Sequence, residues 1–312
     1  MERILTASSL IVPLLIMLFL GALLRRKKII SAQGIGDIKA VIINVCLPAV
    51  IFNAFYNASY NHSTLVILPI IFLACLAALA IGMLLHKAFK TKRDSMPFLL
   101  TGMESGMLGY TLYGLLFGLQ NTGNFAIVDF GQEIFIFTVY MTLLNIKSGN
   151  EAYTFKKAAA GMLKSPPFVA IIAGLVAGAS GLGAALNASA AGAVVSSAIS
   201  FISAPISALI LLVIGFGIEF SRANVKAVLQ SVCLRAGIFA ALCAAVLFTL
   251  EALVPLSSQM KWAVIMLFIL PPPFVLPIFM KKPEEQQYIA TALSLYTLLS
   301  VCAFVVMAFV AV

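Results

Sequence analysis

Long apolar segments follow one another along the chain with little polar sequence between them. Each has about the 20 residues that an α-helix needs to cross the hydrocarbon core of a membrane. Because 62% of the 312 residues are apolar and only 10% are charged, a soluble domain could not bury so much apolar surface. We therefore expect an all-α polytopic membrane protein with ten transmembrane helices. The expected helices cover residues 8–25, 38–56, 64–86, 96–119, 124–146, 166–186, 195–219, 231–254, 262–280 and 287–311.

The basic residues alternate between loops in the manner that fixes the orientation of a membrane protein. Only Arg3 and Lys261 of the 20 Lys and Arg residues fall on the opposite side from the others. The others lie in or next to the first, third, fifth, seventh and ninth loops: Arg25, Arg26, Lys27, Lys28, Lys39, Lys87, Lys90, Lys92, Arg93, Lys147, Lys156, Lys157, Lys164, Arg222, Lys226, Arg235, Lys281 and Lys282. This asymmetry predicts a cell (plasma) membrane protein with both termini outside the cytoplasm. A nucleic-acid partner, which needs a continuous basic surface, is not expected.

Two of the apolar segments are interrupted near their middles. The fourth contains Glu104, Ser105, Gly106 and Gly109, and the ninth contains three successive prolines at residues 271–273. A buried acid is costly in hydrocarbon and marks a functional site by default, while proline removes a backbone hydrogen-bond donor. Interrupted segments at corresponding positions of two halves are the best sequence indication of a transporter's binding site.

The longest polar stretch, residues 147–165, divides the chain into residues 1–146 and residues 166–312. Each part holds five of the expected helices. Because five is an odd number, homologous halves must be inverted relative to one another. We expect two inverted repeats joined by a cytoplasmic linker, with the broken fourth and ninth helices crossing near the membrane midplane.

Several stretches, taken in order, resemble the auxin efflux carrier family, which includes bacterial permeases of organic acids and the plant PIN-type carriers. They are residues 21–31, 43–52, 128–138, 163–167, 210–215 and 270–277. The sequence lacks the long cytoplasmic loop of the plant carriers and is similar to the bacterial members. More distantly, it also looks like the bile acid:sodium symporters.

The resemblance implies a particular architecture and mechanism. A scaffold domain would consist of helices one, two, six and seven, and a transport domain of helices three to five and eight to ten. The transport domain would hold the crossed helices and move in an elevator-type alternating-access mechanism. The implied function is secondary transport of a small organic anion, a carboxylate. We also expect a homodimer in the lipid bilayer.

The sequence departs from the family pattern in the fourth helix. Where the family usually has Asn-Thr-Gly-Phe-x-Gly-x-Pro, this chain has Glu104 in place of the Asn and Thr111 in place of the Pro. A Glu-Ser/Thr-Gly run at a helix crossing looks like the sodium-binding motif of the bile acid:sodium symporters. Because an ionised Glu104 would repel an anionic substrate, we expect this side chain to carry a coupling cation, either sodium or a proton.

The candidate site combines these features. The residues expected to bind the substrate are Asn44, Ser105, Gly106, Gly109, Tyr110, Thr111, Pro271, Pro272 and Pro273. The residues expected to couple the cation are Glu104 (the possible sodium ligand), Ser105, Thr111, Asp129 and Glu133. Asp129 and Glu133 are four residues apart and share one face of the fifth helix. We find no His-Glu-x-x-His motif and no nucleophile–base pair, so we expect neither an enzyme nor a cofactor.

Less specific explanations exist for several of these residues. Glu104 could be a neutral, hydrogen-bonded side chain, and Asp129 could lie in a solvated vestibule. Asn44 could hydrogen-bond between helices, and Arg235 could extend from a helix end to the membrane surface. A sodium/proton exchanger that uses Glu104, Asp129 and Glu133 is the second functional hypothesis. A membrane receptor that binds a ligand without transporting it is the third.

Overall fold

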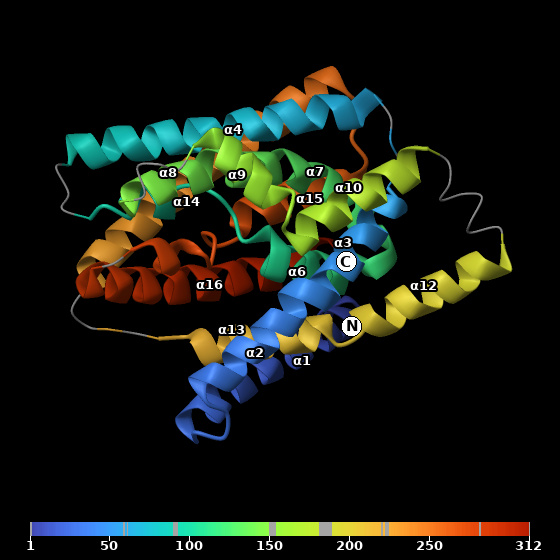
Figure 1. The fold of residues 1–312 in the computed structure, drawn as a ribbon, viewed down its shortest axis with the longest axis horizontal. Coiled ribbons are helices and arrows are strands. Elements are labelled where there is room, and N and C mark those ends of the chain that lie inside the picture. The colour runs from blue at the N-terminus through green and yellow to red at the C-terminus, as the bar shows by residue number, and fades with distance from the viewer. Residues whose placement is uncertain are drawn as a thin grey trace.

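The computed structural model describes residues 2–58, 60, 62–89, 93–149, 154–180, 189–219, 221, 225–280 and 282–311. All regular secondary structure within these ranges is helical (Figure 1). Four of the basic residues used to orient the chain, Lys90, Lys92, Arg222 and Lys281, lie outside the described residues. So does the end of the expected sixth helix, residues 181–186.

The helical elements follow the expected segments closely. Their bounds are α1 Glu2–Arg26, α2 Ala32–Val41, η1 Ile42–Cys46, α3 Leu47–Tyr56, α4 His62–Ala88, α5 Met96–Leu99, η2 Ser105–Gly109, α6 Tyr110–Phe117, η3 Leu119–Asn121, α7 Thr122–Phe135, η4 Ile136–Tyr140, α8 Met141–Lys147, α9 Phe155–Met162, α10 Pro166–Ala179, α12 Ala190–Ser203, α13 Ile206–Gly217, α14 Val225–Leu253, α15 Ser258–Ile269, η6 Leu276–Phe279 and α16 Pro283–Ala311. The all-helical prediction is confirmed for the part of the chain that the structure describes.

Within the described residues, seven helical stretches are long and apolar enough to cross a membrane. They are Thr6–Arg26, Ala32–Tyr56, Ser63–Ala88, Leu119–Lys147, Gly192–Gly217, Val225–Leu253 and Pro283–Ala311. The chain is therefore a multi-span membrane protein. In its described part the sixth expected segment contains the shorter helix α10, and the fourth and ninth segments are broken into short pieces.

Close backbone contacts hold α1 against α13. A Cβ atom on Gly21 would lie 2.1 Å from the carbonyl oxygen of Leu212, and one on Gly215 would lie 2.1 Å from that of Leu18. Small residues allow membrane helices to approach this closely. Figure 1 shows α1, α2 and α13 together on one side of the molecule and α4 on the opposite side.

The remaining packing falls into two sets of neighbours, which also contact each other where α3 packs on α7 and α1 packs on α16. Besides the α1–α13 pair, α3 packs on α10. In the other set, α4 and α15 pack on α7, and α14 packs on α4, α15 and α16. The broken segments α5–α6 and α15–η6 belong to this second set, where α7 and α14 contact them from two sides.

Candidate site at the two helix breaks

The breaks of the fourth and ninth segments touch one another. After α5 the chain leaves helical geometry until η2 begins at Ser105, and after α15 it does so until η6 begins at Leu276. Gly102 adopts a φ of +69° in the first break, a conformation that favours glycine. The N–H of Glu104 donates a hydrogen bond of 2.8 Å to the carbonyl oxygen of Pro271. The expected meeting of the two interruptions is therefore present in the structure.

The Glu104 carboxylate accepts backbone hydrogen bonds from both breaks. Its Oε1 atom accepts from the N–H of Met107 at 3.3 Å, and its Oε2 atom accepts from the N–H of Phe274 at 2.6 Å. A helix break exposes N–H groups that lack partners within the helix, and these groups favour a negative charge. Glu104 thus serves as an anion built into the chain at the junction. Its side chain is partly exposed rather than sealed.

A second group of polar side chains lies beside Glu104, between η2 and α7. The hydroxyl of Ser105 donates to Glu133 Oε1 at 3.1 Å and accepts from Gln132 Nε2 at 3.0 Å. Gln132 Nε2 also donates to Asp129 Oδ1 at 3.2 Å. Asp129 is only 1% exposed, whereas Glu133 is partly exposed. We call Ser105, Asp129, Gln132 and Glu133 the acidic cluster.

Gln132 also fixes the backbone of the first break. Its Oε1 atom accepts a hydrogen bond of 2.6 Å from the N–H of Met103. The amide is fully buried. Its oxygen accepts a hydrogen bond from the break, and its nitrogen donates hydrogen bonds within the acidic cluster. The sequence analysis did not assign a role to Gln132, although its position between two acids on one helix was an available signal.

Arg235 of α14 binds the carbonyl ends of the same breaks. Its Nη1 atom donates to Leu99 O at 2.9 Å, and its Nη2 atom donates to Gly102 O at 2.6 Å and to Leu270 O at 3.1 Å. The guanidinium carbon lies 3.7 Å from the centre of the Phe239 ring. The side chain is 3% exposed, so the expectation that it extends to the membrane surface is wrong. Three of its five N–H donors are instead bound by carbonyls that the breaks leave free.

Several other residues proposed for the site are buried in the packed interior. Thr111 is buried and its hydroxyl donates to Met107 O in the same helix. Pro271, Pro272 and Pro273 are buried, whereas Phe274 is partly exposed. A Cβ on Gly109 would lie 2.5 Å from Phe125, so this glycine serves close packing.

Gly106 and Tyr110 differ from these packed positions. Gly106 is partly exposed, and the nearest side-chain atoms to an added Cβ would be Leu47 Cδ2 at 3.5 Å and Glu104 Oε1 at 4.0 Å. The Tyr110 hydroxyl is buried without a hydrogen-bond partner among the described residues. Asn44 is exposed and donates to Ala40 O in its own helix.

Three carboxyl groups lie at the junction without an ion-pair partner among the described residues. Among the described residues, Glu104, Asp129 and Glu133 form no ion pair with Lys or Arg. No three His, Cys, Asp or Glu side chains in these residues converge as a metal-binding group. A sodium ion would bind to oxygen atoms of the acidic cluster, including the Ser105 hydroxyl, and to free backbone carbonyls. The same carboxylates can instead accept protons.

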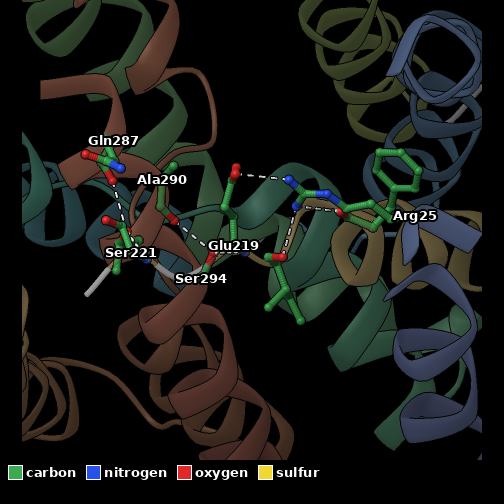
Figure 2. A network of polar contacts seen from close by, with 9 residues as sticks. Arg25, Glu219, Ser221, Gln287, Ala290 and Ser294 are labelled. Atoms are coloured by element: carbon green, nitrogen blue, oxygen red, sulfur yellow. Dashed lines mark hydrogen bonds and ion pairs between the residues drawn. The ribbon is translucent and has the colours of Figure 1, made fainter. Parts of the chain in front are cut away.

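A separate polar network joins the chain after α13 to both sets of helices. Figure 2 shows Arg25 of α1 paired with Glu219 at 3.1 Å and donating to Phe216 O and Ile218 O. The N–H of Glu219 donates to the hydroxyl of Ser294 in α16 at 2.8 Å. The short segment after α13 therefore connects α1 with α16.

Comparison with known proteins gives one distant relative and no family assignment. No protein-family model matches the sequence. An uncharacterised transporter of Methanothermobacter thermautotrophicus is 24% identical over 174 residues. The match includes 53% of this chain and 55% of the relative, so the chain spans about half the length of that protein.

Proposed function

We propose that the protein is a secondary active transporter of a small organic anion, a carboxylate, coupled to sodium or protons. The observation that carries this proposal is the junction of two broken helices at Glu104, Pro271 and Phe274, beside the acidic cluster. The similarity to a transporter and the multi-span helical fold support membrane transport and agree with a protein that is not an enzyme.

The contacts of Glu104 suggest how substrate and cation are linked. In the structure its carboxylate accepts hydrogen bonds from the N–H groups of Met107 and Phe274. These are the groups that a substrate carboxylate would use at a helix N-terminus. We infer that the substrate displaces Glu104 from them, and that a proton or sodium ion compensates the released charge. Transport of the anion would then require the cation.

The packing also supports the architecture implied by the resemblance. The pairs α1–α13 and α3–α10 would form the scaffold domain, and the helices around α7 and α14 would form the transport domain. We propose ten spans in two inverted repeats, with an elevator-type motion of the second set against the first. The cell membrane location, the external termini and a homodimer belong to the same proposal.

A sodium/proton exchanger is the second candidate. Asp129 and Glu133 are linked through hydrogen bonds of Gln132 and Ser105, and no Lys or Arg pairs with either acid in the described residues. Two acids this close favour sharing one cation or proton. The exchanger needs no organic substrate, and this separates it from the leading proposal.

Transport by the purified chain in liposomes distinguishes these candidates. We would measure uptake of radiolabelled small carboxylates with an inward sodium gradient, an inward proton gradient or neither. Accumulation driven by one gradient is expected for the symporter, together with loss of gradient dependence in Glu104→Gln. Asp37→Asn is a matched control because Asp37 is exposed and accepts a hydrogen bond from Gln33 of its own helix.

The other outcomes are equally defined. Sodium-driven proton movement without carboxylate uptake would reject the symporter in favour of the exchanger. Saturable carboxylate binding without flux under any gradient would reject both and indicate a receptor.

A further inference from the structure

A cavity of about 460 Å³ lies between α14, α15 and α16, with Arg235 in its wall. Its lining includes Arg235, Ala240, Cys243, Phe268, Tyr296 and Ser300. Volumes of this size hold small organic ligands, which are bound by apolar walls and a few polar groups. Neither Glu104 nor any member of the acidic cluster lines this cavity, so it is distinct from the proposed transport site.

Arg235 gives the cavity an unbalanced positive charge. A guanidinium carries five N–H donors, and three hydrogen bonds to carbonyls are recorded for Arg235. Two of its donors therefore have no partner among the described residues, and no Asp or Glu in these residues pairs with it. A carboxylate matches a guanidinium in charge and in planar geometry.

Tyr296 supplies a second polar group in the cavity wall. Its ring centre lies 5.6 Å from the guanidinium carbon of Arg235, and its side chain lines the cavity. The residue is 5% exposed, and its hydroxyl lies near the Ser231 side chain but makes no well-formed hydrogen bond in the described part of the chain. Buried polar groups are normally hydrogen-bonded, so this hydroxyl beside Arg235 indicates a site adapted to a polar ligand group.

The rest of the cavity suits a hydrocarbon chain. Ala236, Ala240 and Ala244 of α14 form a row of small side chains that leaves space between the larger residues of α15 and α16. The lining extends along α14 from Arg235 to Leu247, about 18 Å at the rise of an α-helix. The Arg235 guanidinium thus lies near one end of a long apolar cavity.

The depth of Arg235 selects among anionic amphiphiles. It lies ten residues after Val225, the start of the 29-residue helix α14, and therefore close to the middle of the helix. A phospholipid headgroup carries a permanent charge and stays at the membrane surface. A carboxylic acid can enter in its neutral form and ionise beside the guanidinium.

We propose that this cavity binds a long-chain carboxylate of the fatty acid type, with its carboxylate on Arg235 and its chain along α14 toward Leu247. Because Arg235 also holds the carbonyls of Gly102 and Leu270, the ligand contacts the residue that supports both helix breaks. The site is independent of the substrate and the coupling ion proposed above.

The single tryptophan of the chain reports on this site. Trp262 lies on α15, one helical turn before Ile265, which lines the cavity. The C-terminal end of α15 lies near Arg235. For protein in lipid nanodiscs we would titrate ω-bromoundecanoate, whose bromine quenches nearby tryptophan. Saturable quenching that dodecanoate reverses is expected, with affinity at least about tenfold above that of ω-bromoundecanol.

Matched variants locate the binding. Ala240→Phe fills the cavity and should weaken the bromoundecanoate affinity by at least about tenfold. Ala241→Phe should leave it unchanged, because Ala241 is equally exposed on α14 but does not line the cavity. Arg235→Lys should weaken binding of the carboxylate more than binding of the alcohol, provided the variant folds.

Three results would overturn the proposal. One is equal quenching by the carboxylate and the alcohol, and another is unchanged affinity in Ala240→Phe. The third is equivalent, non-saturating quenching by phospholipids brominated in their acyl chains, with no competition by dodecanoate. That result would show that only bulk lipid fills the cavity. None of these results depends on transport, so the transporter proposal is tested separately.

Discussion

Glu104 and Arg235 satisfy opposite ends of the same two helix breaks. The carboxylate of Glu104 accepts from N–H groups of Met107 and Phe274, where helical structure resumes. The guanidinium of Arg235 donates to carbonyls of Leu99 and Leu270, where helical structure stops. Each charge therefore lies at the end of the helix dipole that favours it.

The two charges differ in their surroundings, and this difference separates their roles. Arg235 is buried against the Phe239 ring and holds three carbonyls. Glu104 is partly exposed, holds two N–H groups and lies beside further acids. We conclude that Arg235 mainly stabilises the junction, whereas Glu104 is placed to exchange partners. The following predictions test that division, beginning with the largest expected effect.

Replacing Arg235 with Met should reduce the free energy of unfolding by at least about 3 kcal/mol, because three buried carbonyls lose their donors. Thermal unfolding of the detergent-purified variant measures the loss. Arg26→Met is the control, since Arg26 is exposed at the end of α1. An unchanged melting temperature in Arg235→Met would contradict the stabilising role.

Replacing Glu104 with Gln should cost less, about 1–2 kcal/mol, because the amide has one oxygen for two N–H donors. The same variant should lose the sodium or pH dependence of transport. Unfolding and liposome uptake, measured on the same preparation, give both values. If Glu104→Gln destabilised the protein as much as Arg235→Met and left coupling intact, the assigned roles would be reversed.

Replacing Gly109 with Ala should destabilise the protein by about 1–2 kcal/mol through overpacking. The added Cβ would lie 2.5 Å from Phe125 and 2.8 Å from Leu270, whose carbonyl binds Arg235. Gly36→Ala provides the comparison, because nothing lies within 4 Å of its added Cβ. Similar melting temperatures for the two variants would show that the packing around the Arg235 side of the junction is loose.

Asp94 provides a surface counterpart to the buried charges. Burial by itself would raise the pKa of Asp94, but the hydrogen bonds and charges of Lys147 and Lys282 outweigh it and lower the pKa below its ordinary value. Its contribution to stability is therefore present above the unfolded-state pKa and is lost as the pH falls through the folded-state value.

Asp94→Asn should therefore lower the free energy of unfolding at pH 7 by only about 0.2–1 kcal/mol. The difference from the parent protein should shrink as the pH falls below the ordinary Asp pKa and vanish below the lowered pKa of the folded state, as measured by unfolding curves across pH. A difference that grew toward low pH would contradict this assignment.

The amino-acid pattern was sufficient to locate the helix breaks. Three successive prolines cannot continue a helical ladder, and an acid among glycines is unfavourable in a continuous membrane helix. Both facts are local, so the interruptions near Glu104 and Pro271 could be predicted without knowing any neighbour. The approximate bounds of the long helices followed in the same way from the length of the apolar segments.

Arg235 shows what local reasoning missed. A basic residue near the start of a membrane helix usually extends to the surface, and nothing in the adjacent sequence contradicts that reading. Its acceptors on Leu99 and Gly102 lie more than 130 residues away in the chain. They are available only because another segment is broken there.

The sequence by itself determined that this is a multi-span helical membrane protein with two interrupted segments and an acid within one of them. Hydrophobic length, proline and glycine act through the local backbone, so they can be read from the chain alone. Only the tertiary structure decided which groups complete the interruptions: Glu104 on the N–H groups, Arg235 on the carbonyls and Gln132 on Met103. These partners depend on the rotation and depth of separate helices, which are set by packing across the whole molecule.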